Sequence, residues 1–254
     1  MKIDKPAPGA PCWVELASSD PAASKAFYTE LFGWRAEVDP RPEAGGYTTL
    51  LLGEDAVAGL SPQYREGQPT AWSVSFATAD ADATAAAVRA AGGSLLMEPT
   101  EVLDIGRFAV AADPSGAAFS IWQARLFNGV ALLNEPGSLG WVELATRDTH
   151  GAKEFYSRVF GWSVTVGEMY TQWGLAGRDF GGMMDMADQF PADVPPYWMP
   201  YFAVADVDST AERSVGLGAS VTLPPTDVPD GPRLAVLHDP HGARFGIHVA
   251  DQAS

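Results

Sequence analysis

The chain has 254 residues, 46% of them hydrophobic and 19% charged, a composition that favours one or two packed domains over disorder. Its formal net charge of −16 argues against nucleic-acid and anionic-membrane partners, because both need basic patches on the protein. The one cysteine, Cys12, excludes an intramolecular disulfide. The N-terminal residues lack the apolar region of a signal peptide, and no apolar run has membrane-spanning length, so we expect a cytoplasmic protein.

The first 60 residues alternate between strand and helix signals. Residues 13–17 read as a short strand with alternating faces. Asp20 and Pro21 then provide a helix start, and the residues that follow carry an apolar stripe at helical spacing. Two further strands are predicted over residues 47–52 and 57–60, which flank a turn-like segment.

The same order of elements returns over the next 60 residues. A strand is predicted over 72–77 and an alanine-rich helix over 80–91, where a Gly-Gly pair follows. Three strands come next, over residues 94–97, 107–111 and 117–122. The second set is β-α-β-β-β, and we expect the first to share this plan although only two strands are identified after its helix, so this part of the chain reads as two consecutive modules.

The chain also repeats itself at long range. Trp13–Trp34 and Trp141–Trp162 are identical at 12 of 22 positions, and Pro99–Gly116 and Pro225–Gly242 at 10 of 18. Two matching blocks in the same order and at nearly the same offset indicate a duplicated unit.

The duplication predicts two domains and a linker. We place the first domain at residues 11–123 and the second at 139–250. Residues 124–138 between them contain several apolar side chains, so we expect this linker to pack along the surface that joins the halves.

The repeated motifs resemble a known family. The runs WVEL…D…A..FY..LFGW and GRFAV..DPSGA.F..WQ are similar to vicinal-oxygen-chelate domains of the glyoxalase/bleomycin-resistance/dioxygenase superfamily, in particular to two-domain glyoxalase-like or hydroxylase-like members. The resemblance implies an α+β fold of tandem domains. Four βαβββ modules would form two curved, mostly antiparallel sheets with helices outside. The superfamily includes isomerases, dioxygenases and drug binders, so the fold does not select one function.

The resemblance also implies where a metal would be held. Metal-dependent members bind a divalent ion with His or Glu side chains from four strands. The corresponding positions in this sequence are occupied by Trp13, Gly59, Ser73 and Ser120 in the first half and by Trp141, Gly182, Met199 and Gly246 in the second. None of them is an ordinary metal ligand, so we predict no metal and no cofactor. A divalent metal on other ligands is the alternative.

Period-two alternation assigns the side chains that line the cavity of each half. The ligand-binding candidates are Trp13, Ser73, Ser75, Ser120, Trp122, Trp141, Met199 and Tyr201, and the catalytic candidates are Glu15, Glu143 and His248. Aromatic rings suit a flat ligand, and a buried glutamate with a raised pKa can act as an acid or base. The alternative is structural: the tryptophans fill a core and the glutamates accept internal hydrogen bonds.

The other histidines are expected at the surface. His150 falls in the first turn of a helix, and His238 and His241 flank the Asp-Pro-His-Gly turn. His248 differs because it shares the inward face of its strand with Gly246.

The sequence supports two alternative hypotheses for the function. The first is a metal-independent binding module whose aromatic-lined cavities hold a small aromatic or cationic metabolite. The second is a lyase, dioxygenase or hydroxylase of the same superfamily that uses a metal or the paired acids Glu15 and Glu143. A small molecule is the expected partner in both.

The two fused copies also bear on assembly. Single-domain family members usually pair two copies, so this chain is predicted to be a monomer with an internal pseudo-dimer, and a homodimer is the alternative. The halves differ at Ser73 against Met199 and at Trp122 against His248, which predicts non-equivalent cavities. The second half, with Glu143 and His248, is the better candidate for chemistry.

Overall fold

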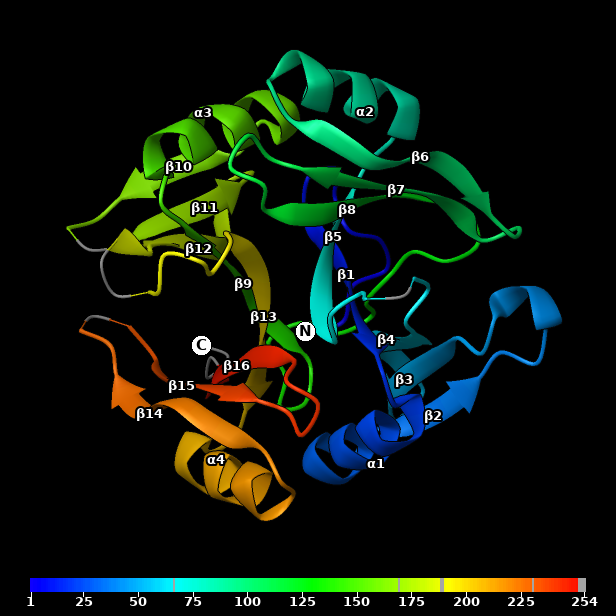
Figure 1. Cartoon of the computed structure of the whole chain (residues 1–254), viewed down its shortest axis with the longest axis vertical. Helices are drawn as coiled ribbons and strands as arrows, with labels where there is room; N and C mark the ends of the chain where they lie inside the picture. The colour runs from blue at the N-terminus through cyan, green and yellow to red at the C-terminus, as the bar shows by residue number, and fades with distance from the viewer. Residues whose placement is uncertain (66, 169, 188–189, 230, 251–254) are drawn as a thin grey trace.

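The computed structural model describes residues 1–65, 67–168, 170–187, 190–229 and 231–250. Within them lie two curved eight-stranded sheets and four α-helices (Figure 1). None of the described helices combines the length and apolar character that a membrane crossing requires.

The first half contains two βαβββ modules and a short 3-10 turn. Its elements are β1 (Pro11–Ser18), α1 (Pro21–Phe32), β2 (Arg35–Val38), the 3-10 turn Pro42–Ala44, β3 (Thr48–Leu52), β4 (Asp55–Pro62), β5 (Ala71–Ala77), α2 (Ala81–Ala90), β6 (Ser94–Val102), β7 (Gly106–Ala112) and β8 (Ala118–Ala124). The strands are ordered β2-β3-β4-β1-β5-β8-β7-β6. The pairs β1–β4 and β5–β8 are parallel, and the other neighbours are antiparallel.

The second half repeats this order. Its elements are β9 (Leu139–Thr146), α3 (Thr149–Phe160), β10 (Ser163–Val166), β11 (Thr171–Leu175), β12 (Arg178–Asp185), β13 (Tyr197–Val204), α4 (Val207–Gly216), β14 (Ser220–Asp227), β15 (Arg233–His238) and β16 (Arg244–Val249). The strand order is β10-β11-β12-β9-β13-β16-β15-β14. The predicted tandem α+β architecture is confirmed. The edge strands β2 and β10 were missed as separate elements, because they are only four residues long and mostly exposed.

All four helices begin in the same way. An aspartate before each helix accepts a hydrogen bond from a backbone N–H of the first turn, which caps the otherwise unsatisfied donors there. These residues are Asp20, Asp80, Asp148 and Asp206.

The halves pack against each other through the sheet faces that carry the helices. Strand β5 contacts β13 in the middle, and helices α1 with α4 and α2 with α3 meet on either side (Figure 1). The main apolar core lies here and is rich in aromatic rings, among them Phe76, Phe119, Phe202 and Phe245. The opposite, inward faces of the sheets are therefore free of the helices.

A hydrogen-bonded Trp–Tyr–Asp set joins the halves twice. In each set the tyrosine hydroxyl accepts from a tryptophan of its own half and donates to an aspartate in the Asp-Pro turn of the other half. The sets are Trp72, Tyr28 and Asp239 (2.9 and 3.1 Å) and Trp198, Tyr156 and Asp113 (2.8 and 3.2 Å). The repeated Phe-Tyr and Asp-Pro motifs thus form the interface between the halves.

The segment between the sheets packs on the surface between the halves in its later part, as predicted, and on the first inward face in its earlier part. Phe127 lies edge-on against Trp13 on the inward face of the first sheet, with ring centroids 4.8 Å apart. The backbone N–H of Val130 donates to the Cys12 carbonyl (2.8 Å) and continues this contact. The later part of the segment packs on the surface between the halves as expected: Leu132 is buried in the main core, and the Gly137 carbonyl accepts from Trp34 Nε1 (2.7 Å).

Candidate functional site

Each inward face carries a hydrogen-bonded Trp–Tyr–Glu set. In the first half, Trp13 Nε1 donates to Tyr47 Oη (2.8 Å), and Tyr47 is also hydrogen-bonded to Glu15. The second half has the equivalent chain: Trp141 Nε1 donates to Tyr170 Oη (3.0 Å), which donates to Glu143 Oε2 (2.9 Å). The tryptophans and glutamates were predicted on this face, and the tyrosines were missed. Their signal was a Tyr-Thr pair at the start of the same strand in both halves.

These tyrosines fill the space beside two positions that the family resemblance assigns to metal ligands. A Cβ atom on Gly59 would lie 2.2 Å from Tyr47 Oη, and one on Gly182 would lie 2.2 Å from the Tyr170 ring. At a third such position, a Cβ on Gly246 would lie 2.1 Å from the Tyr201 ring. A ligating side chain at these glycines would therefore require the rings to move.

The side chains at the implied ligand positions do not fit a divalent ion. Tryptophan, glycine and methionine offer no suitable donor, and serine hydroxyls are weak ligands without carboxylates or imidazoles beside them. In the part of the chain that the structure describes, no group of three or more His, Cys, Asp or Glu side chains is placed to hold a metal.

Burial changes the acid–base character of both glutamates. Glu143 is 7% exposed and also accepts a hydrogen bond from Tyr201 Oη (3.1 Å). Glu15 is half-buried and accepts from Ser61 Oγ (3.0 Å). Loss of hydration raises the pKa of each carboxyl, although the hydroxyl donors partly oppose this effect. Both groups therefore hold a proton more readily than an exposed glutamate.

The two tryptophans of the first inward face are covered, while Glu15, Tyr47 and Ser73 stay partly exposed. Phe127 contacts Trp13 and Trp122, which are 5% and 9% exposed, and its carbonyl accepts from Trp122 Nε1 (2.9 Å). Ser75 and Ser120 are buried beside Trp13, because β1, β5 and β8 are neighbours. The aromatic rings predicted to meet a ligand in this half thus meet the linker.

The second inward face differs in which residues it leaves exposed: Trp141 is partly exposed, unlike Trp13, whereas Glu143 is more buried than Glu15. Met199, Tyr201 and Val236 form a small buried cluster on it. Three partly exposed aromatic residues lie beside this cluster. Trp141 and Tyr197 pack against it, and Tyr170 donates to Glu143. This is the arrangement expected of a surface that meets a flat ligand.

Glu143 and His248 do not form a catalytic pair. Glu143 lies opposite Met199 on β13, whereas His248 lies opposite Ala203, four residues further along. At strand spacing this separates the two levels by about 13 Å. The His248 ring instead packs on Gly140, where a Cβ atom would lie 1.9 Å from Nε2.

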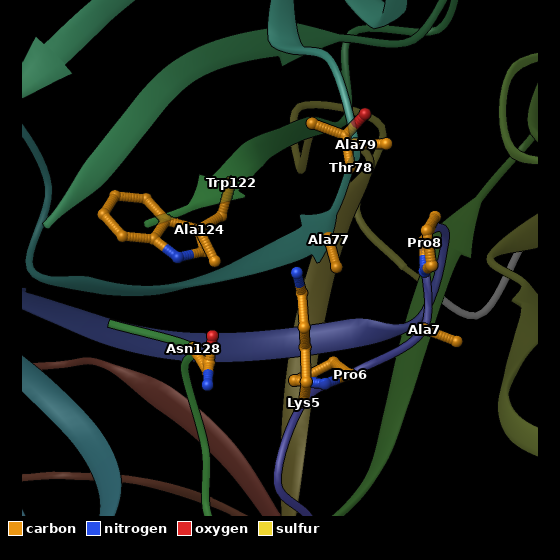
Figure 2. Close-up of a pocket in the computed structure, with 10 residues that line it drawn as sticks. All are labelled: Lys5, Pro6, Ala7, Pro8, Ala77, Thr78, Ala79, Trp122, Ala124 and Asn128. Carbon is orange, nitrogen blue, oxygen red and sulfur yellow. The ribbon is translucent and has the colours of Figure 1, made fainter. Parts of the chain in front are cut away.

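A separate pocket of about 310 Å³ lies beside the first half (Figure 2). The N-terminal segment Lys5–Pro8, the end of β5 and the end of β8 form its walls. Trp122 is the one predicted site residue among those that line it.

Comparison with known proteins identifies one family model that matches both halves of the chain. The model of the Glyoxalase/Bleomycin resistance protein/Dioxygenase superfamily matches residues 12–121 and 138–247. The anthracycline biosynthesis protein DnrV of Streptomyces peucetius is 42% identical over 259 residues, which cover 95% of this chain and 93% of that protein.

Solved structures show the same fold at low identity. The Mn(II)-bound glyoxalase from Novosphingobium aromaticivorans has a TM-score of 0.67 at 17% identity and covers 97% of this chain and 85% of its own. The 2,3-dioxygenase LapB from Pseudomonas sp. KL28 has a TM-score of 0.65 at 13% identity, with 94% and 91% covered. The chain therefore belongs to the glyoxalase/bleomycin resistance protein/dioxygenase superfamily.

Proposed function

We propose that this protein binds a small planar aromatic metabolite on the inward face of its second half, without the metal of its metal-dependent relatives. The ligand would lie against Trp141, Met199 and Tyr201, with Glu143 as a polar contact. The binding unit is a single chain, because the second copy of the fold is already fused to the first.

One observation carries the proposal. In the second half, the positions where the family would place metal ligands hold Trp141, Gly182, Met199 and Gly246, and tyrosine rings fill the space over both glycines. The face offers partly exposed aromatic rings in place of a charged ion site. The similarity to a protein named for anthracycline biosynthesis supports a small organic molecule as the ligand.

Metal analysis and ligand titration test the proposal together. Protein purified without a chelator should contain less than stoichiometric Zn, Ni, Fe or Mn by elemental analysis. Equilibrium dialysis with the neutral planar probe anthraquinone-2-carboxamide should show one bound molecule per chain, with the same affinity in the presence of EDTA. Stoichiometric metal, or a titration that stays flat, contradicts the proposal.

A second candidate function is acid–base catalysis by Glu143. The buried carboxyl accepts hydrogen bonds from both Tyr170 and Tyr201, and burial raises its pKa, which makes it a stronger base than an exposed glutamate. Glu143 would remove a proton from an activated C–H bond of the ligand and return one from solvent.

Deuterium exchange tests this candidate. Benzoylacetone in D₂O should exchange its central C–H protons faster with the protein than without it, as followed by NMR. Glu143→Gln should remove the acceleration, and Glu15→Gln should leave it, because Phe127 covers the tryptophans of the first face. Equal rates in all samples would exclude this role of Glu143.

A further inference from the structure

Arg244 stands at the edge of the second inward face with neutral partners. Its Nε donates to His238 Nε2 (3.1 Å), and its Nη1 donates to Tyr197 Oη. The guanidinium carbon also lies 4.8 Å from the centroid of the Tyr197 ring and 5.8 Å from that of Phe190. Among the described residues, these partners leave the positive charge without a carboxylate.

Composition does not explain why the described residues give Arg244 no acidic partner. The chain has 32 acidic and only 16 basic residues, and surface arginines such as Arg233 form ion pairs with nearby aspartates. A guanidinium has five N–H donors, and the described acceptors engage only Nε and Nη1. Among the described residues, no acceptor engages Nη2 of this half-buried side chain.

His238 holds the guanidinium in place. Its Nε2 accepts from Arg244, so its Nδ1 carries the proton and donates to Thr222 Oγ1 (2.9 Å). Burial and the neighbouring Arg244 charge lower the pKa of His238, which favours the neutral ring that this geometry needs. His238 is partly exposed beside its turn, in line with the expectation of a surface position, and its side chain also lies across from Arg244 on paired strands.

The first half lacks this whole group of residues. The strand registers equate Arg244 with Ala118, His238 with Ala112 and Tyr197 with Ala71. The fold is the same in both halves, so it does not need these polar side chains. Their presence in one half points to a role beyond folding.

The position of Arg244 relates it to the proposed ligand surface. Strands β13 and β16 are parallel, with Tyr201 opposite Gly246, so two residues earlier Arg244 stands beside Met199. Met199 is opposite Glu143 on the next strand. Arg244 and Glu143 therefore flank Met199 on three neighbouring strands, with about 10 Å between their Cα atoms. One planar molecule can reach both groups.

We propose that Arg244 binds a carboxylate on the planar aromatic ligand of the second inward face. The inference rests on the proposed function and adds the chemical class of the ligand, an aromatic acid. The fork of a guanidinium matches a carboxylate, and the neutral Tyr197 and His238 orient it without cancelling its charge.

A matched pair of probes tests the proposal on the full chain. Anthraquinone-2-carboxylate and anthraquinone-2-carboxamide share one ring system and differ in charge. By isothermal titration calorimetry, the acid should bind at least tenfold more tightly than the amide. Arg244→Gln should remove this preference and leave the amide affinity within about twofold, which also shows that the variant is folded. Arg244→Lys should restore part of the preference, because it keeps the charge without the fork.

Arg178→Gln is the control, because Arg178 belongs to the same half and contacts only Met1 Sδ among the described residues. This variant should keep the full preference for the acid. Equal affinities for acid and amide in the unmodified protein, or equal losses in Arg244→Gln and Arg178→Gln, would overturn the role of Arg244 and leave the proposed function standing. If neither probe binds, the proposed function itself fails.

Discussion

The two inward faces carry the same Trp–Tyr–Glu set and differ in what surrounds it. On the first face, Phe127 of the linker covers Trp13 and Trp122, and small residues occupy much of the rest. On the second face, Tyr197 and Tyr201 replace small residues, and Arg244 adds a charge. In one copy of the duplicated unit the linker covers the inward tryptophans, and the other copy keeps an aromatic surface with a carboxyl group and a guanidinium cation.

The surface between the halves shows the opposite behaviour. There the Trp–Tyr–Asp sets are equivalent in residue type and hydrogen bonding. Both sets must satisfy buried polar groups in one shared core, so neither copy can change alone without cost. The inward faces do not touch each other and are free to differ.

The largest expected effects are those of replacing Trp13 and Trp141, which should differ in kind. Trp13→Ala removes a buried ring that packs on Phe127, and should lower the free energy of unfolding by about 3–5 kcal/mol in urea titrations. Trp141→Ala should cost less stability, because Trp141 is partly exposed, but should weaken binding of anthraquinone-2-carboxamide by at least tenfold. Equal effects of both variants on binding would mean that the faces are functionally alike.

Removing Phe127 should make the faces more alike. Phe127→Ala exposes Trp13 and Trp122 and should cost about 2–3 kcal/mol, less than a fully buried ring. The opened face should bind a second molecule of the neutral probe, which equilibrium dialysis would detect as two per chain. Leu126→Ala is the control, because Leu126 is 74% exposed and should change neither stability nor stoichiometry. An unchanged stoichiometry in Phe127→Ala would show that the cover is not what keeps the first face free of ligand.

The interface tyrosines should respond equally. Tyr28→Phe and Tyr156→Phe each leave a buried tryptophan N–H and an aspartate oxygen without the hydroxyl, at a cost of about 1–3 kcal/mol. Urea unfolding of both variants should give similar losses, and the double variant should give their sum. Clearly unequal losses would break the equivalence of the two sets.

The smallest expected effect concerns pH. Burial raises the pKa of Glu15 and Glu143 above the ordinary glutamate value of 4.5, so the folded state binds these protons more tightly than the unfolded chain. Each glutamate therefore stabilises the fold most below pH 4.5, and this contribution is lost as the pH rises through the raised pKa. Glu143→Gln should gain stability relative to the unmodified protein between pH 4 and pH 8 in urea titrations, with Glu15→Gln following the same trend. A difference that is independent of pH would contradict the raised pKa.

Much of the site followed from sequence because strand alternation is local. It predicted that Trp13, Glu15, Trp141 and Glu143 share the inward faces, and the structure has them there in hydrogen-bonded sets. It did not single out Tyr47 and Tyr170, because the strands named as sources of inward-facing residues did not include theirs, and in the structure each tyrosine lies just before its strand. It also suggested Glu143 and His248 as joint candidates for chemistry, although strand register keeps them apart.

The sequence by itself determined the duplication, the family, the order of the modules and the absence of ordinary metal ligands at the implied positions. These features depend on residue types at short, regular spacings along the chain, which can be recognised without the structure. Tertiary structure alone decided that Phe127 covers the tryptophans of the first face, that tyrosine rings fill the space over Gly59 and Gly182, and that His238 orients Arg244. Each of these depends on contacts between segments whose meeting is set by loop path and packing, which no local pattern encodes.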